Sequence, residues 1–184
     1  SHPQARLETV TGVIHGEQTP TRDLLEAAQG ETDEASFAIE RLKIRAGERG
    51  ITGPDLVDAL IHPNERVREI AAPLARTLSP HELHILSRHS LPEARLIAAK
   101  ALSTRLDDLL FLAEQERAPY WLVVIRRLRT LAENGTLSAD ELHLLATHEQ
   151  YAVKEAAAVA DDTRIDDLLL LAQDSGRHYA DLAV

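Results

Sequence analysis

Two stretches of this chain nearly repeat each other at a spacing of 59 residues. The segment TRLDDLLFLAEQ covers Thr104–Gln115, and TRIDDLLLLAQD covers Thr163–Asp174. The same spacing relates SPHELHIL at Ser79–Leu86 to SADELHLL at Ser138–Leu145. Two independent matches at one spacing indicate a duplicated block, and self-similarity at a fixed period is typical of stacked repeat architectures.

Each block contains a shorter unit that consists of a short helix, a tight turn and a second helix. Apolar residues of the second helix recur at helical spacing, as in Val67, Ile70, Ala71 and Leu74. One such helix cannot bury its apolar face alone, but stacked neighbours can. The first leucines after the acidic helix starts mark six units: Leu24, Leu56, Leu83, Leu109, Leu142 and Leu168.

Composition supports an all-helical fold. Hydrophobic residues make up 44% of the 184 residues but aromatic residues only 3%, so the core must consist mainly of Leu, Ala, Ile and Val. Ala and Leu lead the helix propensity scale. The length suits one domain, so we expect a single repeat domain over 1–184. Within this domain, we expect residues 1–18 to form an N-terminal extension or helix and residues 19–184 to form the repeats. The last repeat would be truncated.

Charge and residue usage exclude several functional classes. The net charge of −10 disfavours general attraction to nucleic acid or anionic membranes. The chain has no cysteine, which excludes disulfides, thiolate metal sites and cysteine nucleophiles. No apolar run reaches the roughly 18–20 residues that span a bilayer. Without a secretory leader pattern, the cytoplasm is the expected compartment.

Adjacent aspartates at the start of the repeated helices invite a catalytic interpretation. Neighbours such as Asp107 and Asp108 point about 100° apart on a helix, so they do not converge on one spot. Each pair instead completes a Ser/Thr-x-x-Asp/Glu pattern, which is typical of a helix-capping box. We therefore interpret the acids as structural. Five sites fit the pattern: Thr52–Asp55, Ser79–Glu82, Thr104–Asp107, Ser138–Glu141 and Thr163–Asp166.

The second helices carry a family resemblance. The run His62-Pro-Asn-Glu-Arg-Val67-Arg68-x-x-Ala71-Ala72 resembles the second-helix signature of HEAT-like repeats, and related runs begin at His89 and His148. The unit length is equally similar to the variant leucine-rich repeat. The resemblance implies a right-handed α-solenoid of about five to six helix pairs, whose second helices line the concave face.

One departure from that family pattern recurs. Histidine replaces the family's aspartate before the Val-Arg pair at His62, His89 and His148, and an aspartate occurs only at Asp174. A neutral histidine can still accept a hydrogen bond, whereas a protonated one would repel the basic residue that follows. The histidines should lie roughly 10 Å apart, too far to share an ion at about 2 Å per bond. We therefore expect no metal and no cofactor.

The clearest functional signal is basic and lies on the second helices. It suggests a groove for a protein or an acidic or phosphate-bearing segment. The alternative is that these side chains are solvated and pair with nearby acids. Trp121 occupies the position of Arg68 and is either an interface anchor or a packing residue. The candidate partner-binding residues are Arg41, Arg45, Arg76, Lys100, Trp121, Arg126 and Arg129.

No catalytic motif appears in the chain, such as a Walker loop, a Gly-x-Ser-x-Gly elbow or the His-Glu-x-x-His zinc motif. We therefore expect a non-enzymatic scaffold that binds a protein or peptide. Two alternatives come from the resemblance: a nucleic-acid-binding module similar to HEAT-like DNA glycosylases, and an enzyme similar to HEAT-like chromophore lyases.

Overall fold

The computed structural model describes residues 19–115, 117–161 and 163–181, so the extension expected over 1–18 lies outside the described residues. Helices and turns make up these ranges, and no strand occurs in them. The chain divides into two compact units, with the boundary between Ile97 and Ala98. The expected all-α class is confirmed.

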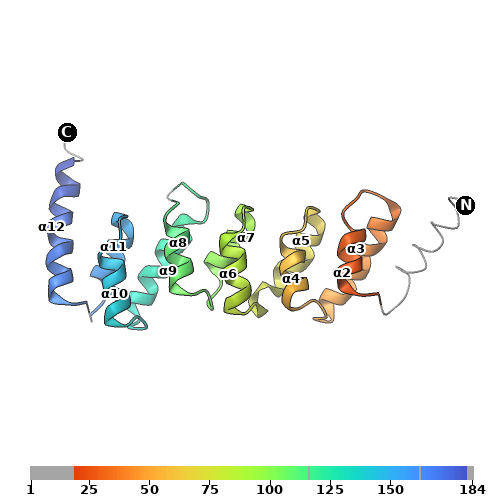
Figure 1. The fold of residues 1–184 in the computed structure, drawn as a ribbon, viewed down its shortest axis with the longest axis horizontal. Coiled ribbons are helices and arrows are strands. Elements are labelled where there is room, and N and C mark those ends of the chain that lie inside the picture. The colour runs from red at the N-terminus through yellow and green to blue at the C-terminus, as the bar shows by residue number, and fades with distance from the viewer. Residues whose placement is uncertain (1–18, 116, 162, 182–184) are drawn as a thin grey trace, which may run out of the picture. The chain divides into compact units, whose positions relative to one another are not determined.

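Eleven α-helices and one 3-10 helix are described (Figure 1). Helix α7 (Pro92–Lys100) crosses the boundary between the units. The first unit holds α2 (Thr21–Ala27), α3 (Asp33–Gly47), α4 (Gly53–Leu60), α5 (Glu65–Ala71), the 3-10 helix η1 (Ala72–Thr77) and α6 (Pro80–Arg88). The second holds α8 (Leu106–Ala113), α9 (Trp121–Glu133), α10 (Ala139–Ala146), α11 (Tyr151–Ala158) and α12 (Ile165–Asp181).

Within each unit the helices pack in pairs, and the pairs pack in two layers. In the first unit α2 contacts α3 and α4, while α3 contacts α5 and α4 contacts α6. In the second unit α8 pairs with α9 and α10 with α11, while α9 contacts α11 and α10 contacts α12. First helices therefore pack on first helices, and second helices on second helices.

Two of the five expected capping boxes form. Ser79 and Ser138 each accept a hydrogen bond from the backbone N–H three residues on, and the glutamate there accepts from the serine N–H. Thr104 and Thr163 differ, because their hydroxyls donate back to the carbonyls of Ala98 and Ala157. Their helices begin two residues later, so neither threonine is the capping residue.

Thr52 also makes no side-chain cap, although it is the residue that precedes α4. The next residue, Gly53, has φ +57°, so the first turn of α4 is not regular. The capping prediction was therefore wrong at three of the five sites.

Proline and glycine shape the ends of the second helices. Pro73 cannot donate the backbone hydrogen bond of a regular helix, and α5 passes into the 3-10 helix η1 at this point. Gly135 has φ +65° just beyond α9, a left-handed conformation that glycine commonly adopts at helix ends. After α3 it is Arg49 that has positive φ, at 58°. At Gly50 a Cβ would lie 2.9 Å from Cγ of Arg45, so a larger residue there would require the Arg45 side chain to move.

The core consists mainly of leucine, alanine, valine and isoleucine, as expected from composition, with Tyr120 as its buried aromatic residue. Leu109 and Leu112 of α8 are fully buried, as are Val124 and Leu128 of α9. None of the helices in the described ranges combines the length and the apolar composition that a membrane crossing requires.

The last helix departs from the repeat. The equivalent helix α8 ends at Ala113 and a turn follows it, but α12 continues unbroken from Ile165 to Asp181. Leu168 is 41% exposed, whereas its repeat equivalent Leu109 is 0% exposed. The difference follows from the neighbouring helices. Helix α9 packs against α8, whereas within the residues that the structure describes no helix follows α12.

Candidate functional site

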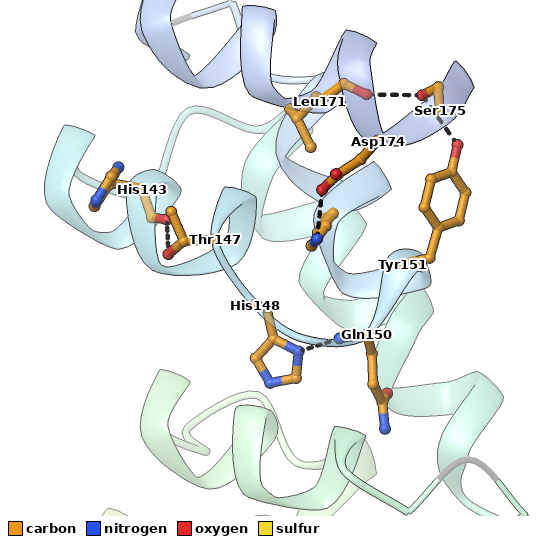
Figure 2. Close-up of polar contacts among 9 residues, drawn as sticks. His143, Thr147, His148, Gln150, Tyr151, Leu171, Asp174 and Ser175 are labelled. Atoms are coloured by element: carbon orange, nitrogen blue, oxygen red, sulfur yellow. Dashed lines mark hydrogen bonds and ion pairs between the residues drawn. The ribbon is translucent and has the colours of Figure 1, made fainter. Parts of the chain in front are cut away.

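The three recurring histidines cap the turns between paired helices. In each ring Nδ1 accepts a hydrogen bond from the backbone N–H two residues later. The N···N distances are 3.0 Å for His62, 3.1 Å for His89 and 3.1 Å for His148. Figure 2 shows the bond from the Gln150 N–H to His148. Each of the three rings therefore serves as a hydrogen-bond acceptor within its turn.

At His62 and His89 the basic residue that follows the histidine binds the same turn, whereas Lys154, which follows His148, donates to Asp174 of α12. Arg68 donates to the carbonyl of His62 at 2.7 Å, and Arg95 donates to the carbonyl of His89. Trp121 occupies this position in its unit, and its indole N–H lies 3.1 Å from the carbonyl of Ala113. The half-buried indole therefore takes over the arginine's hydrogen bond to the preceding turn, which favours the packing interpretation of Trp121.

His148 makes the stability of this turn depend on pH. Burial is the largest influence on its pKa and lowers it, and Lys154 lowers it further; Glu114 and Glu149 act in the opposite direction. The folded state therefore binds fewer protons than the unfolded state, whose histidine pKa is about 6.5. The sign of this linkage means that stability is fully present above about pH 6.5 and declines as the pH falls below it.

We predict that His148→Asn removes part of this pH dependence. The asparagine side chain can accept the same N–H two residues on, but it does not titrate. Urea unfolding followed by circular dichroism at neutral and mildly acidic pH measures the effect. The wild-type protein should lose more stability on acidification than the variant. An equal loss in both proteins would show that His148 does not contribute.

The second aspartate of each repeated pair is buried. Asp108 is 0% exposed and Asp167 is 2% exposed. In the second unit Nδ1 of His143 donates to Oδ1 of Asp167 at 2.7 Å. His84 and His143 occupy equivalent repeat positions, as do Asp108 and Asp167. This co-recurrence is the signal that could have identified the carboxylates as buried.

Polar contacts join α12 to α10 and α11. Besides the His143–Asp167 contact, Lys154 donates to Asp174, and the hydroxyls of Tyr151 and Ser175 lie 3.2 Å apart (Figure 2). These contacts come from one side of α12, the side on which Leu171 is 7% exposed.

The candidate binding residues all lie on second helices or directly after one, but they differ in how much of each side chain is available. Arg45 of α3 is half-buried and donates to the Thr21 hydroxyl at 2.8 Å. Arg41 is also half-buried, whereas Arg76 on η1 and Lys100 at the end of α7 are exposed. The first unit therefore offers Arg76 as its most accessible predicted residue.

In the second unit the candidates gather on α9. Arg126 is exposed, and within the described residues its guanidinium has no hydrogen bond or ion pair. Arg129 is exposed and its Nε lies 2.8 Å from Oε1 of Glu133. Arg127 points elsewhere: it donates to the carbonyls of Lys100 and Leu102, and burial lowers its pKa. Arg127 thus caps the end of α7, while Arg126 and Arg129 remain available to a partner.

Arg129 also lines a pocket between the second helices and α12. The pocket has a volume of about 290 Å³. Its apolar wall includes Ile125 of α9 and Val159 at the end of α11, and Glu155 is the acidic residue of its lining. The remaining lining residues are Tyr151, Ala152, Ala156, Ala158 and Ser175. We call this the α9–α11 pocket.

A larger pocket, of about 490 Å³, lies beside the first helices α2 and α4. Its lining includes Arg22, Glu26 and Asp58, so its charge is mixed. His62 also lines it, but both ring nitrogens are used, since Nε2 donates to the Leu25 carbonyl at 2.8 Å. This pocket therefore lacks the excess of positive charge that would select an acidic partner.

Nowhere in the described ranges do three or more His, Asp or Glu side chains gather in an arrangement that could hold a metal ion. No family model matches this chain, and neither a curated protein nor a solved structure matches it.

Proposed function

We propose that this chain is a non-enzymatic binding module that holds an acidic segment of a protein along its second helices. The observation that carries the proposal is the α9–α11 pocket, whose lining includes the exposed Arg129, together with the exposed Arg126 three residues earlier on α9. An acidic segment is favoured because positive charge on an otherwise acidic protein steers partners of negative charge to one face.

The finer architecture forms part of this proposal. Paired helices in two layers are what a right-handed α-solenoid of HEAT-like or variant leucine-rich type requires, with the second helices on its concave face. Four helix pairs, α2–α3, α4–α5, α8–α9 and α10–α11, together with the consecutive helices α6 and α7 and the final helix α12, fit the expected number of units. Such repeat arrays present extended surfaces formed by one layer of helices, which suits a binding function.

Charge reversal on α9 tests the proposal. The probe is a fluorescein-labelled peptide that alternates Leu, Asp and Glu, and its binding is measured by fluorescence anisotropy. We expect R126E/R129E to weaken binding about tenfold or more, since exposed ion pairs contribute about 0.2–1 kcal/mol each and reversal adds repulsion. Binding to the wild-type protein should also weaken as salt is added.

The matched control is R105E/R117E. Both residues are exposed and belong to the second unit, but neither lies on a second helix, and the change in net charge is the same. The control should bind the peptide nearly as well as the wild-type protein. Equal losses in the two variants would mean that net charge alone governs binding. Tighter binding of duplex DNA than of the peptide at low salt would favour the nucleic-acid alternative instead.

A further inference from the structure

The α9–α11 pocket suggests which acidic segments the protein prefers. Pockets that enclose small-molecule ligands or cofactors usually have volumes of about 300–1,000 Å³. A volume of about 290 Å³ lies at the lower end of that range. The pocket is thus suited to one amino-acid side chain rather than to a large cofactor.

The lining specifies the chemistry of that side chain. Five of the nine lining residues are aliphatic, namely Ile125, Ala152, Ala156, Ala158 and Val159. Ala156 is 2% exposed, and Ile125, Ala152 and Val159 are half-buried, so an apolar group that enters would remove further apolar surface from water. On α12 the hydroxyl of Ser175 is held by Tyr151 and by the Leu171 carbonyl. An aliphatic side chain therefore fits this lining better than a charged one.

The charged residues of the lining determine on which side of the pocket an acidic residue of the bound segment would lie. Arg129 lies on α9, one turn beyond Ile125, and Glu155 lies on α11. A carboxylate on the segment would be attracted to Arg129 and repelled by Glu155. Nε of Arg129 already donates to Glu133, and the two terminal nitrogens of the guanidinium remain as donors.

We propose that the α9–α11 pocket binds an aliphatic side chain, such as leucine, of an extended peptide whose neighbouring carboxylate pairs with Arg129. This inference rests on the proposed function and refines it. The pocket selects the apolar residue, and the arginines of α9 select the acidic neighbour.

Two fluorescein-labelled peptides test this inference. They have the same acidic sequence, but one carries leucine at the central position and the other carries alanine. The wild-type protein should bind the leucine peptide about tenfold more tightly, because the larger side chain buries more apolar surface. Ala152→Leu fills the pocket from α11 and should remove this preference, so that the two peptides bind the variant with affinities within about twofold of each other.

Ala139→Leu is the control, because it adds the same side chain at an exposed position in the first turn of α10. It should keep the leucine preference. Should Ala152→Leu fail to fold by circular dichroism, Val159→Thr replaces it, since this change introduces a hydroxyl into the pocket wall at nearly constant volume. It should reduce the preference severalfold.

The outcomes separate this inference from the proposed function. Equal wild-type affinity for the two peptides, with R126E/R129E still weakening both, would overturn the pocket inference and leave the proposed function standing. A leucine preference that survives both Ala152→Leu and Val159→Thr would also overturn the pocket inference. Failure of the wild-type protein to bind either peptide would overturn both.

Discussion

Leu109→Ala should lower the free energy of unfolding by about 2–5 kcal/mol, the range for truncating a buried leucine. Leu109 is 0% exposed in α8. Its repeat equivalent Leu168 is 41% exposed in α12, so Leu168→Ala should cost about 1 kcal/mol or less, because less apolar surface is lost and alanine favours the helix. The two substitutions remove the same atoms from nearly the same sequence.

Urea unfolding followed by far-UV circular dichroism measures both effects. The two losses of stability can be compared directly because the surrounding sequences, DDLLFLA and DDLLLLA, differ at one position. A loss from Leu168→Ala as large as that from Leu109→Ala would mean that the face of α12 is covered in solution.

His143→Leu should cost about 1–3 kcal/mol, the penalty for leaving a buried polar group without its partner. Asp167 is 2% exposed, and Nδ1 of His143 donates to its Oδ1 at 2.7 Å. No hydrogen-bond partner for the other oxygen, Oδ2, is found among the described residues. The substitution therefore removes the hydrogen bond that offsets much of the cost of burying this carboxylate.

The double variant His143→Leu/Asp167→Leu distinguishes this cause from a simple loss of packing. Replacing both partners by apolar groups removes the buried charge together with its partner, so the double variant should be more stable than His143→Leu alone. His81→Leu is the control, because His81 is exposed near the start of α6 and should change stability by less than about 0.5 kcal/mol. A double variant less stable than His143→Leu would contradict this account of Asp167.

The helical pairs could be predicted from the sequence because their signals are local and repeated. Apolar spacing within Val67–Leu74 and the recurrence at 59 residues both depend on neighbours in the chain. The capping boxes at Ser79 and Ser138 were predictable for the same reason. Thr104 and Thr163 match the motif equally well, but their hydroxyls bond to the preceding helix, a choice that the motif alone does not encode.

The candidate site was less predictable because it depends on contacts between helices. The sequence places Arg126, Arg127 and Arg129 on one basic helix, yet Arg127 turns to the end of α7. The pocket was not foreseen either, since alanines such as Ala152 and Ala156 are ordinary helix residues until their neighbours are known. The helical course of α12 through Gly176 was also missed, because the earlier repeats have a turn there.

The central claim is that the second helices of the second unit hold an acidic segment. Chemical-shift mapping tests it most directly: the 15N-labelled chain is titrated with the leucine-containing acidic peptide, and the amide signals are followed by two-dimensional NMR. We predict that the largest changes fall on α9 and α11, around Arg129, Ala152, Glu155 and Val159. Changes confined to the first helices α8 and α10, or no saturable changes, would contradict the claim.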